Sequence, residues 1–231
     1  MKHVLITGAS RGIGLETARC FLENGYCVTG VCLREESKLQ AQKLLPSVKF
    51  ICADVAKEKD AERVLSGFSS LDVLVNNAGI AYFDLVQDTS FSAFERVMNV
   101  NAGGAFLFTK HAVKKMLERG GSIVNVSSVW GETGGSCESV YSASKGAVIA
   151  FTKAIAKELA PSRITVNCVS PGVIDTQMNA HLTNEDRRAL SDDIPLGRFG
   201  SAREVAEAIF FLANAEYITG QTLGVNGGFH I

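Results

Sequence analysis

The chain has 231 residues, and at about 150 residues per domain this length suits a single α/β domain. Its 23 basic and 24 acidic side chains give a net charge of −1, which argues against nucleic acid or an anionic membrane as a partner. Hydrophobic residues make up 46%, enough for a large core, but no run approaches ~20 apolar residues, so no membrane span is expected.

Cysteine usage and the N-terminus favour a reducing compartment. The cysteines are scattered among apolar runs and form no Cys-x-x-Cys pair, so we reject a metal site and expect small core side chains. The first apolar run reaches Thr7-Gly8 too soon for a signal peptide, and we expect a cytoplasmic protein. The six cysteines are Cys20, Cys27, Cys32, Cys52, Cys137 and Cys168.

Short β-rich runs alternate with helical stretches along the whole chain. This alternation predicts a doubly wound, seven-stranded parallel sheet with helices on both faces (a Rossmann-like fold), in one domain spanning residues 1–231. Only 175–200 lacks a clear element, and because it follows a strand we expect a lid over the substrate at about 176–200. Strands are expected at 4–7, 27–33, 48–52, 73–76, 122–127, 165–170 and 222–225, and helices at 13–24, 36–45, 57–68, 91–119, 140–160 and 203–213.

The first strand runs into a glycine-rich turn. Such glycines let the backbone approach a pyrophosphate, and the helix that follows offers free N–H groups to it. The spacing is G-x-x-x-G-x-G rather than G-x-G-x-x-G, so a tight structural loop is the alternative. The turn reads Thr7-Gly8-Ala9-Ser10-Arg11-Gly12-Ile13-Gly14.

The end of the second strand predicts the cofactor. An acidic residue there would bind the ribose 2′-hydroxyl of NAD, but the expected position holds Cys32. Arg34 and Arg11 suit a 2′-phosphate, because guanidinium groups pair with phosphate oxygens. We therefore expect NADP(H), with the alternative that Arg34 is a solvated residue whose charge Glu35 and Glu36 compete for.

Tyr141 and Lys145 share one face of a helix, because they are four residues apart. An ammonium near a phenol favours the phenolate, so Tyr141 could exchange a proton with a carbonyl or alcohol oxygen. Ser128 lies at the end of the preceding strand, where its hydroxyl could hold the substrate oxygen, although Ser127 is adjacent. An exposed helix pair is the alternative interpretation.

Two asparagine-containing segments complete the pattern. Asn76-Asn77-Ala78-Gly79 ends the fourth strand with small residues that would let a cofactor approach. Asn101 falls inside an expected helix, where asparagine is slightly unfavourable, so we expect either a polar role or a surface amide.

Together these motifs resemble the short-chain dehydrogenase/reductase family over essentially the whole chain. The resemblance implies that Tyr141 is the acid/base, that Lys145 lowers its pKa and binds the nicotinamide ribose, that Ser128 orients the carbonyl, and that Asn101 supports a proton-relay water. It implies cofactor contacts from Gly8, Ser10, Arg11, Gly12, Ile13, Gly14, Arg34, Asp54, Val55, Asn77, Ala78, Gly79, Tyr141, Lys145, Pro171, Gly172, Val173 and Thr176.

The substrate is less specified. Two C-terminal stretches, at 195–200 and 218–228, are similar to bacterial 3-oxoacyl-(acyl-carrier-protein) reductases of fatty acid biosynthesis, but many relatives share them. The segment Ala81-Tyr82-Phe83-Asp84 departs from the Thr-Arg-Asp-like stretch of that group, and Tyr82, Trp130 and Cys137 are expected near the substrate.

The leading interpretation is an NADPH-dependent reductase of a ketone, with a 3-oxoacyl thioester as the first choice. One alternative is a dehydrogenase of a steroid, sugar or other secondary alcohol. Another is a non-catalytic dinucleotide-binding protein, although the intact set of catalytic residues argues against it. Arg119 and Arg163 could attract an acidic acyl carrier protein or be ordinary surface residues. Apolar helices at 91–119 and 140–160 predict a homotetramer, or failing that a dimer.

Overall fold

The computed structural model describes residues 1–179 and 182–231. Its single sheet is parallel throughout and has the strand order β3-β2-β1-β4-β5-β6-β7, which confirms the predicted fold class. The strands are β1 (His3–Thr7), β2 (Cys27–Cys32), β3 (Lys49–Cys52), β4 (Val73–Asn76), β5 (Gly121–Val126), β6 (Ile164–Pro171) and β7 (Thr222–Val225).

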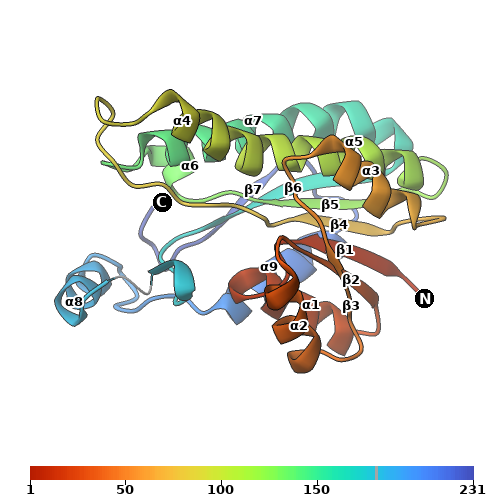
Figure 1. Cartoon of the computed structure of the whole chain (residues 1–231), viewed down its shortest axis with the longest axis horizontal. Helices are drawn as coiled ribbons and strands as arrows, with labels where there is room; N and C mark the ends of the chain where they lie inside the picture. Colours follow the sequence, from red (N-terminus) through yellow and green to blue (C-terminus); the bar gives the residue numbers. More distant parts are fainter. Residues whose placement is uncertain (180–181) are drawn as a thin grey trace.

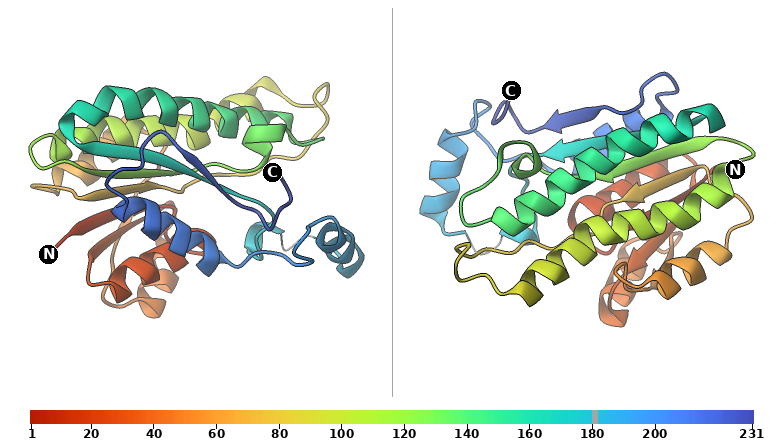
Figure 2. Two further views of the ribbon diagram at one scale, coloured as in Figure 1. Left: turned by 180° about the vertical axis from the view of Figure 1, so that it is seen from behind. Right: turned by 90° about the horizontal axis from the view of Figure 1, so that it is seen from above.

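Helices cover both faces of the sheet (Figures 1 and 2). Alternate residues of one strand serve the two cores: Ile6 packs with Phe21 on one face, and Leu5 packs with Phe108 on the other. Burying one such side chain stabilises the fold by about 1.5–3 kcal/mol. One layer contains α1 (Gly12–Glu23), α2 (Glu35–Leu44) and α9 (Ala202–Asn214), and the other contains α3 (Glu58–Ser66), α4 (Phe91–Met98), α5 (Gly104–Met116) and α7 (Ser139–Leu159).

The chain order reverses between β1 and β4, the central pair of the sheet. Strands β2 and β3 continue outward on one side of β1, and β4 to β7 continue on the other. Ligands of open α/β sheets bind at the carboxyl ends of the strands beside such a reversal. The glycine-rich turn after β1 and the Asn77 segment after β4 therefore meet where a dinucleotide would lie.

The long helix predicted at 91–119 is interrupted. Between α4 and α5 the backbone forms a π-helical turn, η1 (Asn99–Gly103), which contains the buried Asn101. Such turns occur frequently at functional sites. The sequence pattern did not signal it, because the apolar residues on both sides continue a helical repeat.

Two other helices were missed. Helix α8 (Asn184–Asp192) lies within the stretch expected to lack an element and begins with a capping box between Thr183 and Asp186. It contains no buried residue, so no apolar stripe announced it. The short helix α6 (Trp130–Thr133) follows β5. The bounds of the other predicted elements lie within two residues of the observed ones.

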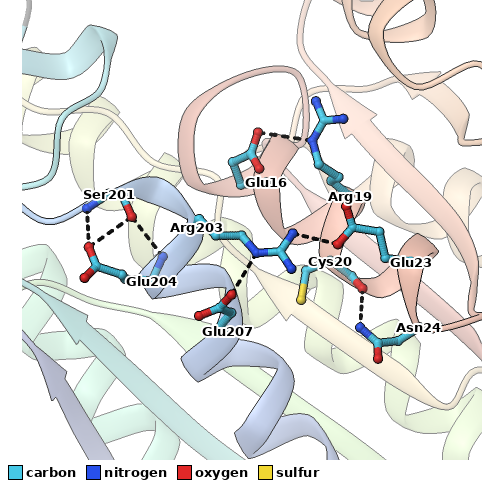
Figure 3. A network of polar contacts seen from close by, with 9 residues as sticks. All are labelled: Glu16, Arg19, Cys20, Glu23, Asn24, Ser201, Arg203, Glu204 and Glu207. Atoms are coloured by element: carbon cyan, nitrogen blue, oxygen red, sulfur yellow. Dashed lines mark hydrogen bonds and ion pairs between the residues drawn. The ribbon is translucent and has the colours of Figure 1, made fainter.

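A polar network fastens α9 to α1 (Figure 3). Arg203 Nη1 lies 2.7 Å from Glu23 Oε2, and Arg203 Nε donates to Glu207 at 2.9 Å. Ser201 and Glu204 form the capping box that starts α9. Each exposed ion pair contributes only ~0–1 kcal/mol to stability. The network therefore mainly fixes the position of the start of α9 against α1.

No helix in the described part of the chain is long and apolar enough to cross a membrane. Within residues 1–179 and 182–231, no group of His, Cys, Asp and Glu side chains could hold a metal ion. The cysteines are all free; Cys20, Cys32 and Cys168 are buried, as expected of core side chains, whereas Cys27 is exposed.

Candidate active site

Tyr141 and Lys145 lie on the first turns of α7, and Ser128 lies just beyond the end of β5. The Tyr141 hydroxyl is hydrogen-bonded to Ser128. The Lys145 ammonium donates to the carbonyl oxygen of Val126 at 2.8 Å and lies 5.8 Å from the centre of the Tyr141 ring. All three side chains are buried, so the exposed-pair alternative is wrong.

Burial sets the protonation of this group. It raises the pKa of Tyr141 to about 12, against which the hydrogen bond from Ser128 acts. It lowers the pKa of Lys145 to about 8. Desolvation is the largest cause of the raised pKa of Tyr141, and the Lys145 ammonium binds Val126 here, so the expectation that Lys145 lowers the pKa of Tyr141 stays a prediction. At neutral pH Tyr141 is a phenol that can give a proton.

Asn101 is not the surface amide that the sequence left open, since only 2% of it is exposed. Its Oδ1 accepts from Ile80 N at 2.8 Å, and its Nδ2 donates to Ile80 O at 3.0 Å and to Ser144 Oγ at 2.9 Å. Its amide thus ties the segment after β4 to α7. Its support of a proton-relay water stays a prediction.

Gly79 lies where these parts converge. A Cβ atom placed on Gly79 would lie 3.2 Å from Lys145 Nζ and 3.3 Å from Asn101 Oδ1. The small residue therefore leaves room beside the ammonium, as predicted for a close approach by a cofactor.

The glycine-rich turn and the segment after β4 hold each other. Asn77 Nδ2 donates to the carbonyl oxygens of Thr7 at 3.0 Å and Gly8 at 3.1 Å, and Thr7 Oγ1 accepts from Asn77 N and Ala78 N at 3.0 and 3.1 Å. Gly8 has a positive φ of 66°, and a Cβ atom there would lie 2.8 Å from Ala78 Cα. The turn is thus a fixed cradle at the N-terminus of α1, whose first turn contains no acidic residue.

Cys32 at the end of β2 meets Ser10 of the glycine-rich turn, close in sequence to Arg34 and Arg11. Cys32 is buried and hydrogen-bonded to Ser10, while Arg34 is exposed at the N-cap of α2. Glu35 pairs with Lys38 at 2.7 Å, so its charge is engaged away from Arg34. Arg11 lies in the glycine-rich turn, and its Nη1 donates to Gln177 Oε1 at 3.4 Å.

The remaining predicted cofactor residues lie along the same edge of the sheet. Asp54 follows β3, where its Oδ1 accepts from Ala56 N at 3.1 Å, and Val55 beside it is buried. Gly12 and Ile13 begin α1, and a Cβ atom on Gly12 would lie 3.5 Å from Thr176 Cγ2. The start of the 176–200 region therefore lies next to the phosphate-binding turn.

Pro171 ends β6, and Gly172 N donates to Val225 O at 3.0 Å. Val173 accepts from Gly200 N at 3.0 Å, which closes the base of the 176–200 region. Their contact with a nicotinamide stays a prediction.

Three residues support the site through contacts that the sequence analysis did not predict. Ser127 Oγ donates to Lys145 O at 2.9 Å, Ser144 binds Asn101, and Trp130 N donates to Ser128 Oγ at 3.2 Å. The two adjacent serines have different partners: Ser127 binds the backbone of α7 at Lys145, whereas Ser128 faces Tyr141. The only signal in the sequence for this support was the presence of further serines, Ser127 and Ser144, beside Ser128 and Tyr141.

The residues expected near the substrate form one loop cluster. The Tyr82 hydroxyl donates to Asp84 at 3.1 Å, and Asp84 N donates to Cys137 O at 2.8 Å. Cys137 has a positive φ of 61°, unusual for a residue with a side chain, and lies four residues before Tyr141.

Comparisons with known proteins agree with this geometry. The sequence profile of the family described as enoyl-(acyl carrier protein) reductase matches residues 8–230. The chain is 36% identical to an uncharacterized oxidoreductase, YmfI, of Bacillus subtilis (99% of each chain covered) and 40% identical to the 3-oxoacyl-[acyl-carrier-protein] reductase FabG of Aquifex aeolicus (98% of this chain and 96% of the relative). The crystal structure of an actinorhodin polyketide ketoreductase variant with NADPH is 34% identical and superposes with a TM-score of 0.95, covering 99% of this chain and 97% of that one.

Proposed function

The chain belongs to the short-chain dehydrogenase/reductase family of oxidoreductases, and we propose that it uses NADPH to reduce a ketone to a secondary alcohol, with a 3-oxoacyl thioester as substrate. The observation that carries the proposal is the buried Tyr141 phenol, hydrogen-bonded to Ser128 beside the Lys145 ammonium. A phenol that is protonated at neutral pH suits proton donation to a ketone oxygen.

The glycine-rich turn and the segment after β4 fit a bound dinucleotide. Gly8 and Gly12 leave space and free N–H groups at the N-terminus of α1, and Gly79 leaves space beside Lys145. When bound, NADPH supplies a hydride to the carbonyl carbon. Tyr141 then gives its proton to the carbonyl oxygen, Ser128 holds that oxygen, and Lys145 holds the nicotinamide ribose. Asn101 keeps the segment of Gly79 against α7.

The preference for NADP(H) rests on the end of β2. Cys32 is buried and uncharged, since burial raises the pKa of its thiol to about 11, so it does not repel a 2′-phosphate as a carboxylate would. Arg34 and Arg11 are exposed, and their guanidinium groups would pair with that phosphate. The structural neighbour with NADPH supports the same choice.

The thioester substrate rests on the FabG relatives, and it would place the enzyme in the reductive step of fatty acid biosynthesis. The alternative, a dehydrogenase of a steroid, sugar or other secondary alcohol, draws on the departure at Tyr82 to Asp84. A non-catalytic dinucleotide-binding protein is disfavoured by the buried catalytic set. The lid at 176–200 would close over whichever ketone binds.

An acyl carrier protein is the partner that a 3-oxoacyl thioester implies. Arg119 and Arg163 lie at the amino-terminal ends of β5 and β6, where Arg163 Nη2 donates to Glu118 O at 3.3 Å. Tyr141 lies at the opposite edge of the sheet, roughly 20 Å away along these strands. These two arginines and Tyr141 therefore lie at opposite edges of the sheet.

Assembly is proposed to be a homotetramer, with a dimer as the alternative. Phe91, Phe94 and Phe106 on α4 and α5 are exposed, and β7 is an edge strand with Leu223 exposed. Apolar residues on these surfaces suit pairing with identical copies. Light scattering at micromolar concentration tests this, and a monomer would contradict it. The free buried cysteines support a reducing, cytoplasmic location.

The test of function is NADPH oxidation with a panel of ketones that includes acetoacetyl thioesters. Turnover of the thioesters above steroid and sugar ketones is expected. Activity on a steroid or sugar ketone alone would favour the alternative, and NADPH binding without turnover of any ketone would favour a non-catalytic protein.

A further inference from the structure

The last residues of the chain, 226–231, leave β7 and run along the catalytic end of the sheet. Gly172 N donates to Val225 O at 3.0 Å, which sets the end of β7 beside the Pro171-Gly172 turn. Figures 1 and 2 place the C-terminus beside α6 in every view. Since α6 begins two residues after Ser128, the C-terminal tail lies close to the residue that holds the ketone oxygen.

The path of the tail is fixed by two glycines. Gly227 and Gly228 have positive φ angles of 64° and 86°. A Cβ atom on Gly227 would lie 2.8 Å from Ile194 Cγ2, and one on Gly228 would lie 3.1 Å from the Pro195 side chain. Leu196 N also donates to Gly227 O at 3.1 Å. The tail is therefore held against the last part of the 176–200 region.

The tail ends on the tryptophan next to the catalytic serine. The rings of Phe229 and Trp130 meet edge to face, with centres 5.6 Å apart and planes at 71°. The indole also contacts Gly135, where a Cβ atom would lie 3.0 Å from Trp130 Cδ2. Both aromatic side chains are only half-buried, so part of each ring is exposed, and the backbone N of Trp130 contacts the Ser128 hydroxyl.

We propose that Trp130 and Phe229 form the apolar wall against which the substituent of the ketone packs, so that the C-terminal tail determines substrate specificity. This inference rests on the proposed ketone reduction but not on the thioester. Each methylene group that the wall removes from water would lower KM about fourfold, because its transfer is worth ~0.8 kcal/mol. Longer apolar substituents should therefore bind more tightly until the wall is covered.

The first experiment compares Phe229→Ala, Phe229→Leu and, as a matched control, Phe211→Ala, which removes an exposed ring on α9. KM and kcat are measured for 3-oxoacyl thioesters of N-acetylcysteamine and for methyl ketones, both with substituents of increasing length. In the wild type KM should fall with length. Phe229→Ala should raise KM for the longest members about tenfold, flatten the trend and leave kcat and the KM of NADPH within about twofold. Phe229→Leu should keep most of the trend, and Phe211→Ala all of it.

A wild-type KM that does not depend on length, or a rise in KM that is equal for short and long substrates in Phe229→Ala, overturns the proposal. Reduction of methyl ketones but of no thioester would reject the thioester function and leave the wall to be judged on the ketone series alone.

The second experiment needs no turnover, because Trp130 is the one tryptophan of the chain. Its fluorescence is followed while a long methyl ketone is added to the wild-type protein saturated with NADP⁺. A shift of the emission to shorter wavelength, absent or much reduced in Phe229→Ala, is expected from burial of the indole. No change in emission up to the solubility limit of the ketone overturns the proposal.

Discussion

The start of α7 and the 176–200 region, which we propose to serve the same site, are built differently. Lys145, Asn101 and Ser128 are buried and held by hydrogen bonds of 2.8–3.2 Å to backbone and side-chain partners. Helix α8 lies apart from the sheet (Figure 1) and contains no buried residue, and its Arg187 reaches Asp175 at 2.8 Å across an exposed surface. The first region has one arrangement that satisfies its polar groups, whereas the second is fastened by contacts that water can replace.

This difference separates chemistry from recognition. Buried polar groups cost free energy when they lose a partner, so the catalytic residues must occur in a fixed pattern, which a sequence reveals. Exposed contacts contribute little, so the recognition region can vary without loss of the fold. We therefore expect the strength of mutational effects to fall from the buried region to the exposed one.

The largest effect is expected for Tyr141→Phe. The variant keeps the packing of the ring but removes the proton donor, and kcat should fall by about 10² or more, as for a lost general acid. NADPH affinity, measured by fluorescence titration, should change little. Turnover near that of the wild type would show that another group gives the proton.

Lys145 tests what burial of the catalytic group costs. Its pKa is lowered to about 8, so up to that pH the fold buries an ammonium with a penalty of roughly 3 kcal/mol. Between about pH 8 and the ordinary value near 10.5 the unfolded chain binds more protons than the native one, so the free energy of unfolding rises with pH.

Lys145→Met should therefore lose turnover and cofactor affinity. It removes the buried ammonium but also the bond to Val126 O, so the prediction concerns pH dependence: the stability of the variant relative to the wild type should fall between pH 7 and pH 9.5. Urea denaturation of both proteins at the two pH values measures it. The buried thiols and Tyr141, whose pKa values are raised, are present in both proteins, so their own titration cancels in the difference. A stability difference between the two proteins that is the same at both pH values would contradict the account.

We expect effects of intermediate size at the residues proposed to bind the 2′-phosphate, because Arg11 and Arg34 are exposed while Cys32 is buried. We expect at least about tenfold preference for NADPH over NADH in kcat/KM, since one charge-assisted contact is worth ~1.5–3 kcal/mol. Arg34→Ala should weaken NADPH and leave NADH nearly unchanged, and Cys32→Asp should shift the preference towards NADH. Equal kcat/KM for both cofactors in the wild type would reject this assignment.

The smallest effect is expected for Arg187→Ala. It removes the ion pair with Asp175 and the stacking of the guanidinium on Phe199 at 4.7 Å, both on the surface. The free energy of unfolding should change by less than about 1 kcal/mol, whereas Asn101→Ala, which leaves buried partners unpaired, should cost about 1–3 kcal/mol. Chemical denaturation of the two variants compares them directly. A larger loss in Arg187→Ala would erase the distinction between the regions.

The same distinction explains what the sequence could predict. The bounds of β4 and the fold class follow from apolar runs that the sheet must bury. Helix α8 was not predicted because it contains no buried apolar side chain. The turn at Asn99–Gly103 was not predicted because a π-helical turn leaves the apolar repeat of the flanking helices intact.

Within the site, the spacing of Tyr141 and Lys145 was readable but their environment was not. Desolvation, which sets both pKa values, depends on the packing of distant segments against α7. For the same reason Asn101 could not be told from a surface amide. The position of Arg119 and Arg163 at the far edge of the sheet likewise required the topology.

The most direct test of the account is a single-turnover reaction of the NADPH complex with acetoacetyl thioester, followed by the loss of NADPH absorbance and by analysis of the product. The account predicts one 3-hydroxyacyl thioester formed for each NADPH consumed in the wild type, and a rate slower by about 10² or more in Tyr141→Phe. Equal rates in the two proteins, or NADPH consumption without a hydroxyacyl product, would contradict it.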